Sequence, residues 1–392
     1  MRGTMAHETT RREMLKTTGM AAAAVSMVTL PEWALPAMAQ GETLVPFADW
    51  PENFNANPAP DRRLFNTQGI TSPYTAADQF FTTQHYGHPV IDPASWRLKV
   101  SGLVDRPASL SVDELRKLGG TELVAGFECS GNRRPLQGLI GNGRWTGVPL
   151  KTVLERAGLK ASAREIVFFG ADKGPEEVEF RAQKFSVEQN YGRSMARDKA
   201  LASDAFLAYA LDGQPLTRHQ GAPLRLIVPG WYGAPNVKWL SEIHVQEDQY
   251  LGKFQARWYR TLKGEMINGE MKWVETAITH LQLKSFVARV TRMGNDYKVL
   301  AIALNDGTPL KSVELKIDDG QWVAMTPDTT TSAKYGWKFY NYTWKGAAAG
   351  EHTLVSRATD TTGKVQPTEA ELEVKKTFLE DNSQHPRKVR LA

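Results

Sequence analysis

The C-terminal third of the sequence limits the fold most strongly, because almost nothing after about residue 270 shows the periodicity of a helix. Between residues 283 and 374, runs of alternating apolar and polar residues are separated by turns at 305–307, 318–320 and 349–350. Such strands and turns are typical of a β-sandwich of about 100 residues. The alternating runs cover residues 297–304, 312–317, 337–344 and 352–358. Because the chain has a single cysteine, the disulfide of antibody domains is excluded.

The sequence before this region mixes helix and strand signals. Ser111 and Glu114 form a capping box that predicts a short helix through Leu118, and residues 150–157 predict a helix that ends at Gly158. Strands are predicted at residues 96–100, 121–127, 165–169, 205–211 and 224–228. The predicted fold class is therefore α+β, with a mixed α/β domain followed by an all-β, immunoglobulin-like sandwich.

The first 39 residues predict an export signal. Arg11 and Arg12 precede an apolar run at 19–30, and Ala37-Met38-Ala39 offers a cleavage site. An amphipathic N-terminal helix, the alternative, explains neither the arginine pair nor the small residues. The run is shorter than the roughly 20 residues that span a bilayer. We expect a twin-arginine signal peptide (1–39), export of the folded chain to the periplasm, and no membrane anchor in the mature chain.

The 392 residues suit two domains of roughly 100–200 residues each. We predict one domain at 40–268, which begins with an extended Pro- and Asn-rich arm at 40–78, and a sandwich domain at 269–392. The net charge of +5 is modest and spread along the chain. We interpret the basic residues 387–390 as a solvated chain end, and no motif indicates a nucleic-acid partner.

The segment with the most chemical content is GFECSGNRR, residues 126–134, which contains Cys129. The Gly-Asn turn can point backbone amides at an anion, and the two arginines that follow stabilise a thiolate. Thiolate is a soft ligand for a transition metal, while arginine suits an oxyanion or phosphate. A lone cysteine is more often a small buried hydrophobe. The Gly-Asn-Arg-Arg context favours a metal or anion site here.

Three segments in this order resemble the molybdopterin-binding core of the sulfite oxidase family. They are CSGNRR (129–134), IGNGRWTGVPL (140–150) and GAPLRLIVPGWYGAPNVKWL (221–240). The sandwich, with VELKIDDG at 313–320, is similar to the dimerisation domain of that family. The resemblance covers roughly residues 75–370. It implies a catalytic domain that binds molybdopterin and a homodimer formed through the sandwich.

The resemblance implies one molybdenum-molybdopterin per chain, favours the form without a nucleotide while leaving that point open, and makes Cys129 the thiolate ligand of the metal. Arg225 and Lys238 match basic residues that hold the phosphate end of the pterin. Asp172 matches a carboxylate that accepts from pterin N–H groups, and Gln220 stands where relatives have His or Asn. The residues predicted to bind the cofactor are Thr83, Gln84, His85, Cys129, Asp172, Gln220, Arg225, Asn236, Val237 and Lys238.

The predicted catalytic residues are Cys129, Arg134 and Tyr259. Arg134 matches an arginine that faces the oxyanion in sulfite-oxidising relatives, and Tyr259 matches a tyrosine whose hydroxyl faces the metal. Two features depart from the family. Thr83 stands where relatives have an arginine, and the loop after Arg134 is shorter. A pocket that lacks one arginine binds a dianion less tightly or accepts a less charged substrate.

The implied activity is the two-electron oxidation of sulfite to sulfate. The sequence has no Cys-x-x-Cys-His motif for a covalent haem, so an external periplasmic cytochrome c is the expected electron acceptor. Two alternatives share the fold: a reductase for sulfoxides such as oxidised methionine, and a sulfur-oxidation subunit that acts on protein-bound sulfur. A non-catalytic β-sandwich adhesion module is the alternative from another functional class.

Overall fold

The computed structural model describes residues 38–51, 63–134, 137–202, 204–330 and 333–392. The arginine pair and the apolar run of the predicted export signal lie outside the described residues. None of the described helices is both long and apolar enough to cross a membrane.

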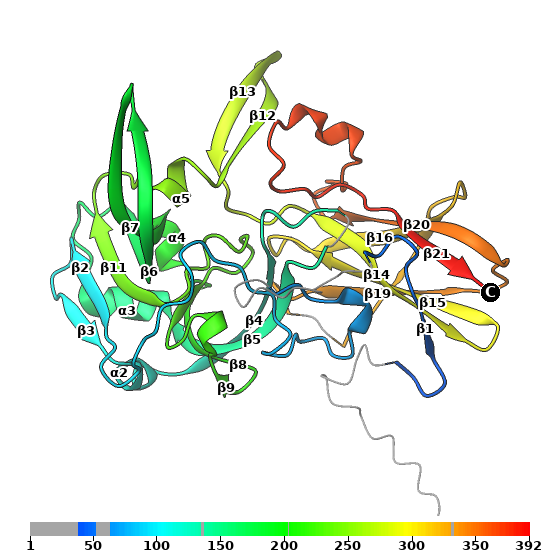
Figure 1. Ribbon diagram of the computed structural model, residues 1–392, viewed down its shortest axis with the longest axis horizontal. Coiled ribbons are helices and arrows are strands. Elements are labelled where there is room, and N and C mark those ends of the chain that lie inside the picture. Colours follow the sequence, from blue (N-terminus) through cyan, green and yellow to red (C-terminus); the bar gives the residue numbers. More distant parts are fainter. Residues whose placement is uncertain (1–37, 52–62, 135–136, 203, 331–332) are drawn as a thin grey trace, which may run out of the picture. The chain divides into compact units, whose positions relative to one another are not determined.

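The first region of the chain is built on two five-stranded sheets (Figure 1). One has the order β3–β2–β11–β6–β7, in which β2 and β11 are parallel and the other neighbours antiparallel. Its strands are β2 (Leu98–Gly102), β3 (Ala108–Leu110), β6 (Glu165–Phe180), β7 (Gln183–Ala196) and β11 (Leu240–Gln246). The other has the antiparallel order β10–β8–β5–β4, and β9 pairs with β8. Its strands are β4 (Thr121–Glu128), β5 (Ile140–Pro149), β8 (Phe206–Leu211), β9 (Gln214–Pro215) and β10 (Arg225–Ile227).

The helices of this region are short, and two of them confirm sequence predictions. In α2 (Val112–Arg116), Ser111 and Glu114 form the expected capping box. α3 (Leu150–Ala157) ends at Gly158, whose φ of 72° suits glycine. The other helices in the described part of the chain are α4 (Arg197–Leu201), α5 (Lys253–Ala256), the 3-10 turns η2 (Thr67–Gly69) and η3 (Arg218–Gln220) and, in the C-terminal region, the 3-10 turn η4 (Ala370–Val374).

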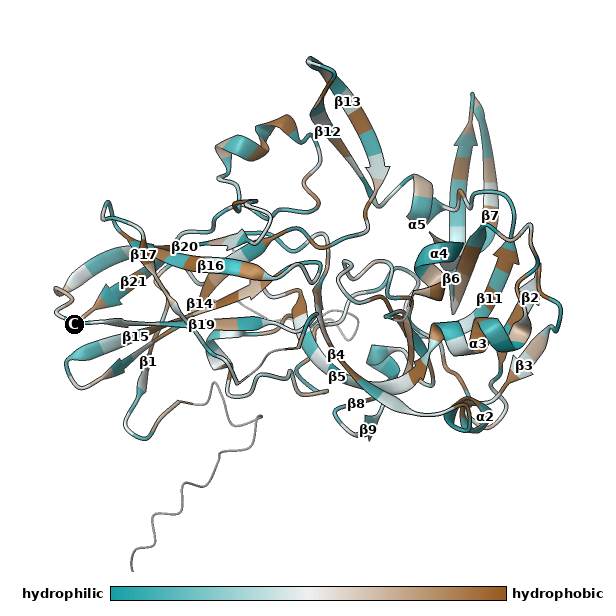
Figure 2. Cartoon of the chain, turned by 180° about the vertical axis from the view of Figure 1, so that it is seen from behind, coloured by the Kyte–Doolittle hydropathy of each residue, from teal (hydrophilic) through white to brown (hydrophobic). Residues whose placement is uncertain are grey.

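The C-terminal region is the predicted β-sandwich. One sheet has the order β1–β14–β15–β19–β18 and the other β17–β16–β20–β21. Their bounds are β1 (Thr43–Val45), β14 (Lys284–Met293), β15 (Asp296–Leu304), β16 (Leu310–Ile317), β17 (Val323–Ala324), β18 (Thr326–Pro327), β19 (Lys338–Trp344), β20 (Gly350–Asp360) and β21 (Arg387–Leu391). Apolar and polar residues alternate along β16 and β20 (Figure 2), because each strand buries one face. The α+β class is confirmed.

Three features of the structure differ from the expected organisation. β1, part of the arm predicted to belong to the first domain, pairs with β14 of the sandwich. The boundary predicted at residue 269 falls in the turn of a continuous hairpin, β12 (Arg260–Ile267) with β13 (Glu270–Ala277). The interpretation of residues 387–390 as a solvated end is wrong: β21 pairs with β20, and Arg387 is fully buried.

One hydrophobic cluster joins the two regions. It contains Phe127 and Trp145 from β4 and β5 together with Phe286, Trp337 and Leu379 from the C-terminal region. Cys129 packs against the edge of the same cluster. The turn that carries Cys129 therefore lies where the first region meets the sandwich.

Candidate active site

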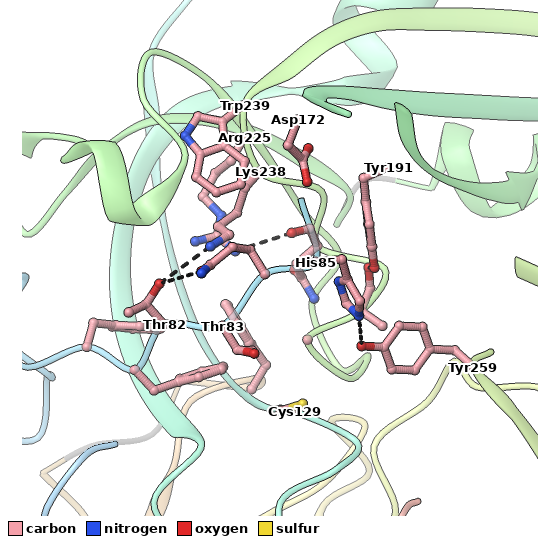
Figure 3. Close-up of a pocket in the computed structure, with 17 residues that line it drawn as sticks. Thr82, Thr83, His85, Cys129, Asp172, Tyr191, Arg225, Lys238, Trp239 and Tyr259 are labelled. Atoms are coloured by element: carbon pink, nitrogen blue, oxygen red, sulfur yellow. Dashed lines mark hydrogen bonds between the residues drawn. The ribbon is translucent and has the colours of Figure 1, made fainter. Parts of the chain in front are cut away.

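A cavity that is partly open to solvent lies beside Cys129 (Figure 3). Its walls combine aromatic side chains with a few ionisable ones. The lining residues are Phe80, Phe81, Thr82, Thr83, Gln84, His85, Phe127, Cys129, Asp172, Tyr191, Arg225, Gly233, Ala234, Asn236, Lys238, Trp239 and Tyr259.

Most residues that the sequence predicted for the site line this cavity, and three do not. Gln220 is buried beside it: its side-chain oxygen accepts from the Thr217 N–H (3.1 Å), and its amide donates to the Ala77 carbonyl. Val237 is buried, and its carbonyl accepts from the Leu226 N–H (2.8 Å). Both residues thus shape the backbone behind Arg225. Direct cofactor contacts from them stay a prediction.

Arg134 is the third residue outside the cavity. Its guanidinium pairs with Glu369, in a separate groove that Arg133 and Phe378 also line. Arg134 lies in this groove because the nearby C-terminal segment provides the carboxylate of Glu369. Its predicted contact with a substrate oxyanion is therefore absent from this arrangement and stays a prediction.

Cys129 follows β4 in a tight turn. Its N–H donates to the Leu139 carbonyl (2.9 Å), and its own carbonyl accepts from the Asn132 N–H (2.8 Å). The side chain is half-buried and faces the cavity from the side opposite Arg225, Lys238 and Asp172 (Figure 3). The turn therefore presents a thiol to one end of the cavity.

Arg225 has the most informative environment in the cavity. It opens β10, is only 4% exposed, and donates to the carbonyls of Gln220 (3.0 Å) and Asn236 (3.3 Å). Among the described residues no carboxylate forms an ion pair with it, and its buried Nε has no hydrogen-bond partner. Burial lowers the pKa of this guanidinium to about 9. A buried charge without a counter-ion is unfavourable, so the site is suited to an anionic ligand.

Lys238 adds a second cation to the same end of the cavity. Its ammonium donates to the His219 carbonyl (3.2 Å) and lies 4.3 Å from the centre of the Trp239 ring. The cavity therefore has two cationic side chains at this end and the Cys129 thiol at the other. This polarity suits an elongated ligand with an anionic end.

Asp172 reaches the cavity because of a β-bulge. The sequence predicted a strand that ends at residue 169, whereas β6 continues to Phe180 with a shift of register between Phe169 and Lys173. The bulge turns the Asp172 side chain into the cavity. Burial raises the pKa of this carboxyl to about 7, although Lys238 acts in the opposite direction. N–H donors from a ligand would stabilise its charged form.

Tyr259 and His85 form a hydrogen-bonded pair on the wall nearest α5. The Tyr259 hydroxyl lies 2.8 Å from His85 Nε2. Burial, together with Lys238 and Lys253, lowers the pKa of His85 to about 4, so the ring is neutral at pH 7. Burial raises the pKa of Tyr259 well above its usual value. The pair thus offers a neutral, directed hydroxyl to the cavity.

Arg193 is a supporting residue that sequence reasoning missed. It lies in β7, is 1% exposed, and donates to the carbonyls of Phe254 and Ile278 (2.7 Å for the latter). These two residues flank the segment that carries Tyr259. No sequence pattern indicated it, since residues 183–190 of the same strand are mostly polar and predict no strand.

Comparisons with known proteins indicate the family of the chain. Residues 85–254 match the model of the oxidoreductase molybdopterin binding domain. The chain is 30% identical to sulfite oxidase of Gallus gallus over 322 residues, which are 75% of this chain and 68% of that protein. It is 34% identical over 225 residues to mitochondrial sulfite oxidase of Mus musculus, of which the match spans only 38%.

A solved structure supports the fold over nearly the whole chain. The sulfane dehydrogenase SoxCD from Paracoccus pantotrophus superposes with a TM-score of 0.70, covering 96% of this chain and 97% of that one. At 21% sequence identity this likeness describes the fold alone.

Proposed function

Since this chain belongs to the sulfite oxidase family of molybdopterin enzymes, we propose that it is a periplasmic, molybdenum-dependent sulfite dehydrogenase. It oxidises sulfite to sulfate and passes the electrons to an external c-type cytochrome. One observation carries the proposal: buried Arg225 faces the cavity without a carboxylate partner among the described residues, while Cys129 faces the same cavity.

The residues of the cavity fit one molybdopterin with its metal. Arg225 and Lys238 would hold the phosphate end, and Asp172 would accept from N–H groups of the pterin. Cys129 would bind molybdenum as a soft thiolate ligand. When bound, this cofactor supplies the two-electron redox chemistry and the oxygen-atom transfer.

The chain itself positions the reactants and controls their charges. Tyr259 lines the cavity with its hydroxyl bonded to His85, and this hydroxyl would orient the substrate. Neutral His85 fixes that hydroxyl without adding a positive charge. Aromatic side chains such as Phe127 and Tyr191 keep bulk water from the bound cofactor.

The test is metal analysis combined with a steady-state assay on the purified protein. We expect about one molybdenum per chain and reduction of ferricytochrome c that depends on sulfite. Reduction of a sulfoxide by reduced viologen, without turnover of sulfite, would support the reverse chemistry instead. A protein purified from molybdate-supplied cells without molybdenum would contradict the proposal and favour a non-catalytic module.

A second candidate rests on the charge of the cavity. Thr83 lines it where relatives have an arginine, and Arg134 lies outside it. Among the described lining residues, Arg225 and Lys238 are the only Arg or Lys, and a cofactor phosphate would occupy both. No Arg or Lys of the described lining would then remain to bind the substrate. Such a lining suits a less charged substrate, such as sulfur carried on a protein cysteine. Turnover of a persulfide on a carrier peptide, with none of free sulfite, would establish this candidate.

The proposal includes a homodimer formed through the sandwich, since two-fold interfaces are the commonest way for identical chains to assemble. Light scattering at micromolar concentration should give the mass of two chains. The mass of one chain under these conditions would contradict the proposed homodimer.

A further inference from the structure

Both neighbours of Cys129 in the sequence are bonded to the C-terminal region. Glu128 is 1% exposed and its carboxylate lies 3.1 Å from the ammonium of Lys284, on β14 of the sandwich. On the other side, the Ser130 carbonyl accepts from the Glu380 N–H (2.7 Å). The turn is therefore held on both sides of Cys129 by residues more than 150 positions away.

Glu128 also holds the turn from within. Its carboxylate accepts from the side-chain amide of Asn132 (2.9 Å), and the Asn132 side-chain oxygen accepts from the Leu139 N–H (2.9 Å). The Glu128 carbonyl accepts from the Gly233 N–H of the cavity wall (2.6 Å). Glu128 thus links the Cys129 turn, the cavity wall and the sandwich.

Lys284 is fixed as tightly as its partner. It is fully buried, and its ammonium donates to the Asp381 carbonyl (2.8 Å) as well as to Glu128. A buried ion pair contributes little net stability compared with well-packed apolar residues, whereas breaking one leaves a charge without compensation. Because the Glu128–Lys284 pair lies beside Cys129, we expect it to affect the position of the thiol more than the free energy of unfolding.

We infer that the Glu128–Lys284 pair is a positioning device through which the sandwich sets the direction of the Cys129 thiol. The sandwich is then part of the active-site architecture in addition to any role in assembly. The two residues touch neither the cavity nor a substrate; they act through the turn between residues 128 and 132. The inference rests on the proposed function only where it treats Cys129 as the metal ligand.

The test uses the full chain with Lys284→Met and, separately, Glu128→Gln, which keeps the shape and the Asn132 contact but removes the charge. In cofactor-free protein, the limiting rate of alkylation of the Cys129 thiolate, taken from a pH profile so that a changed thiol pKa does not enter, reports how firmly the thiol is held, since it is the only cysteine. In the loaded enzyme, the thiolate-to-metal absorption band and kcat report its position at the metal.

We expect alkylation to accelerate about 10-fold in both variants, and kcat to fall about 10- to 100-fold with KM nearly unchanged, as for other residues that orient a metal ligand. The absorption band should shift. Asp49→Asn is the matched control, because it disrupts the ion pair with buried Arg387 elsewhere in the sandwich. It should lower the melting temperature and leave alkylation, absorption and kcat unchanged.

Unchanged alkylation in Glu128→Gln and Lys284→Met, with a loss of melting temperature like that of Asp49→Asn, would overturn the inference. If Lys284→Met does not fold, Glu128→Gln decides alone. Faster alkylation without any shift of the absorption band would uphold the positioning role and show that Cys129 is not the metal ligand, which separates this inference from the proposed function.

Discussion

Two buried arginines, one in each region, have similar surroundings and different partners. Arg225 lies over the rings of Phe127 and Trp145, at 5.4 and 5.0 Å from their centres. In the sandwich, Arg387 lies 5.1 Å from the Phe47 ring and 4.8 Å from the Trp50 ring. Only Arg387 meets a carboxylate, that of Asp49 at 3.5 Å.

The difference shows how a buried cation can be assigned a role. The counter-ion of Arg387 is Asp49 of the N-terminal arm, and this pair joins the arm to β21. Arg387 therefore has a structural role. Arg225 faces a cavity and has no such partner among the described residues, so its counter-ion is expected from a ligand. Aromatic stacking is common to both and does not distinguish them.

The largest effect should come from the thiol at the other end of the cavity. Cys129→Ser replaces a soft thiolate with a hard, weakly acidic hydroxyl. Turnover should fall by several orders of magnitude, while some pterin remains bound through Arg225 and Lys238. A serine variant with near-normal activity and an unaltered absorption band would remove Cys129 from the site.

Replacing each arginine by methionine tests the comparison itself. Arg387→Met leaves Asp49 without its partner and should cost about 3 kcal/mol in the free energy of unfolding, with normal molybdenum content. Arg225→Met should cost the cofactor-free protein only about 1–2 kcal/mol through two lost hydrogen bonds, but reduce molybdenum content about 10-fold. Urea unfolding measures the free energy of unfolding of both variants, and metal analysis measures their molybdenum content. Equal molybdenum contents would show that the two arginines do not differ in role.

The sandwich also contains a buried group without partners, but an uncharged one. Neither ring nitrogen of His385 has a hydrogen-bond partner among the described residues, and burial and nearby cations lower its pKa from 6.5 to about 2. Below pH 6.5 the unfolded chain binds a proton that the folded chain does not, so stability falls as pH falls. By pH 4.5 the loss in the free energy of unfolding should be about 3 kcal/mol.

His385→Gln removes this titration and should flatten the stability profile between pH 6.5 and 4.5, as urea unfolding at several pH values would measure. An equally steep profile in the variant would mean that His385 is not the group responsible.

The smallest effect is expected at Arg134. Its partner Glu369 is largely exposed, and such pairs contribute at most about 1 kcal/mol. Since Arg134 lies outside the cavity, Arg134→Met should change kcat/KM for sulfite by no more than about fivefold, at normal molybdenum content. A loss of 10- to 100-fold, as the family motif predicts, would place Arg134 at the substrate.

Sequence patterns predicted the elements whose residues carry their own signal. β16 and β20 alternate because each buries one face, β15 ends in an apolar run that is buried on both faces, and α2 has its capping box within four residues. β21 was missed because its outward Lys388 and Arg390 and its buried Arg387 form one run of charge. β7 was missed because its first half is polar and exposed on both faces.

For the candidate site, local motifs and the family resemblance predicted about half of the residues that line the cavity, but not those that support it. Thr83, Cys129, Arg225 and Lys238 stand in recognisable segments and line one cavity in the structure. The role of Lys284 could not be predicted, because it depends on an ion pair with Glu128, 156 residues earlier in the chain. Partners brought together only by tertiary structure leave no pattern in a single sequence.

The most direct test is X-ray absorption at the molybdenum edge, comparing the unaltered protein with Cys129→Ser loaded under the same conditions. We expect the variant to retain bound molybdenum with one sulfur neighbour fewer. An unchanged number of sulfur neighbours would show that the thiol at the end of the cavity does not bind the metal, and would contradict the central assignment.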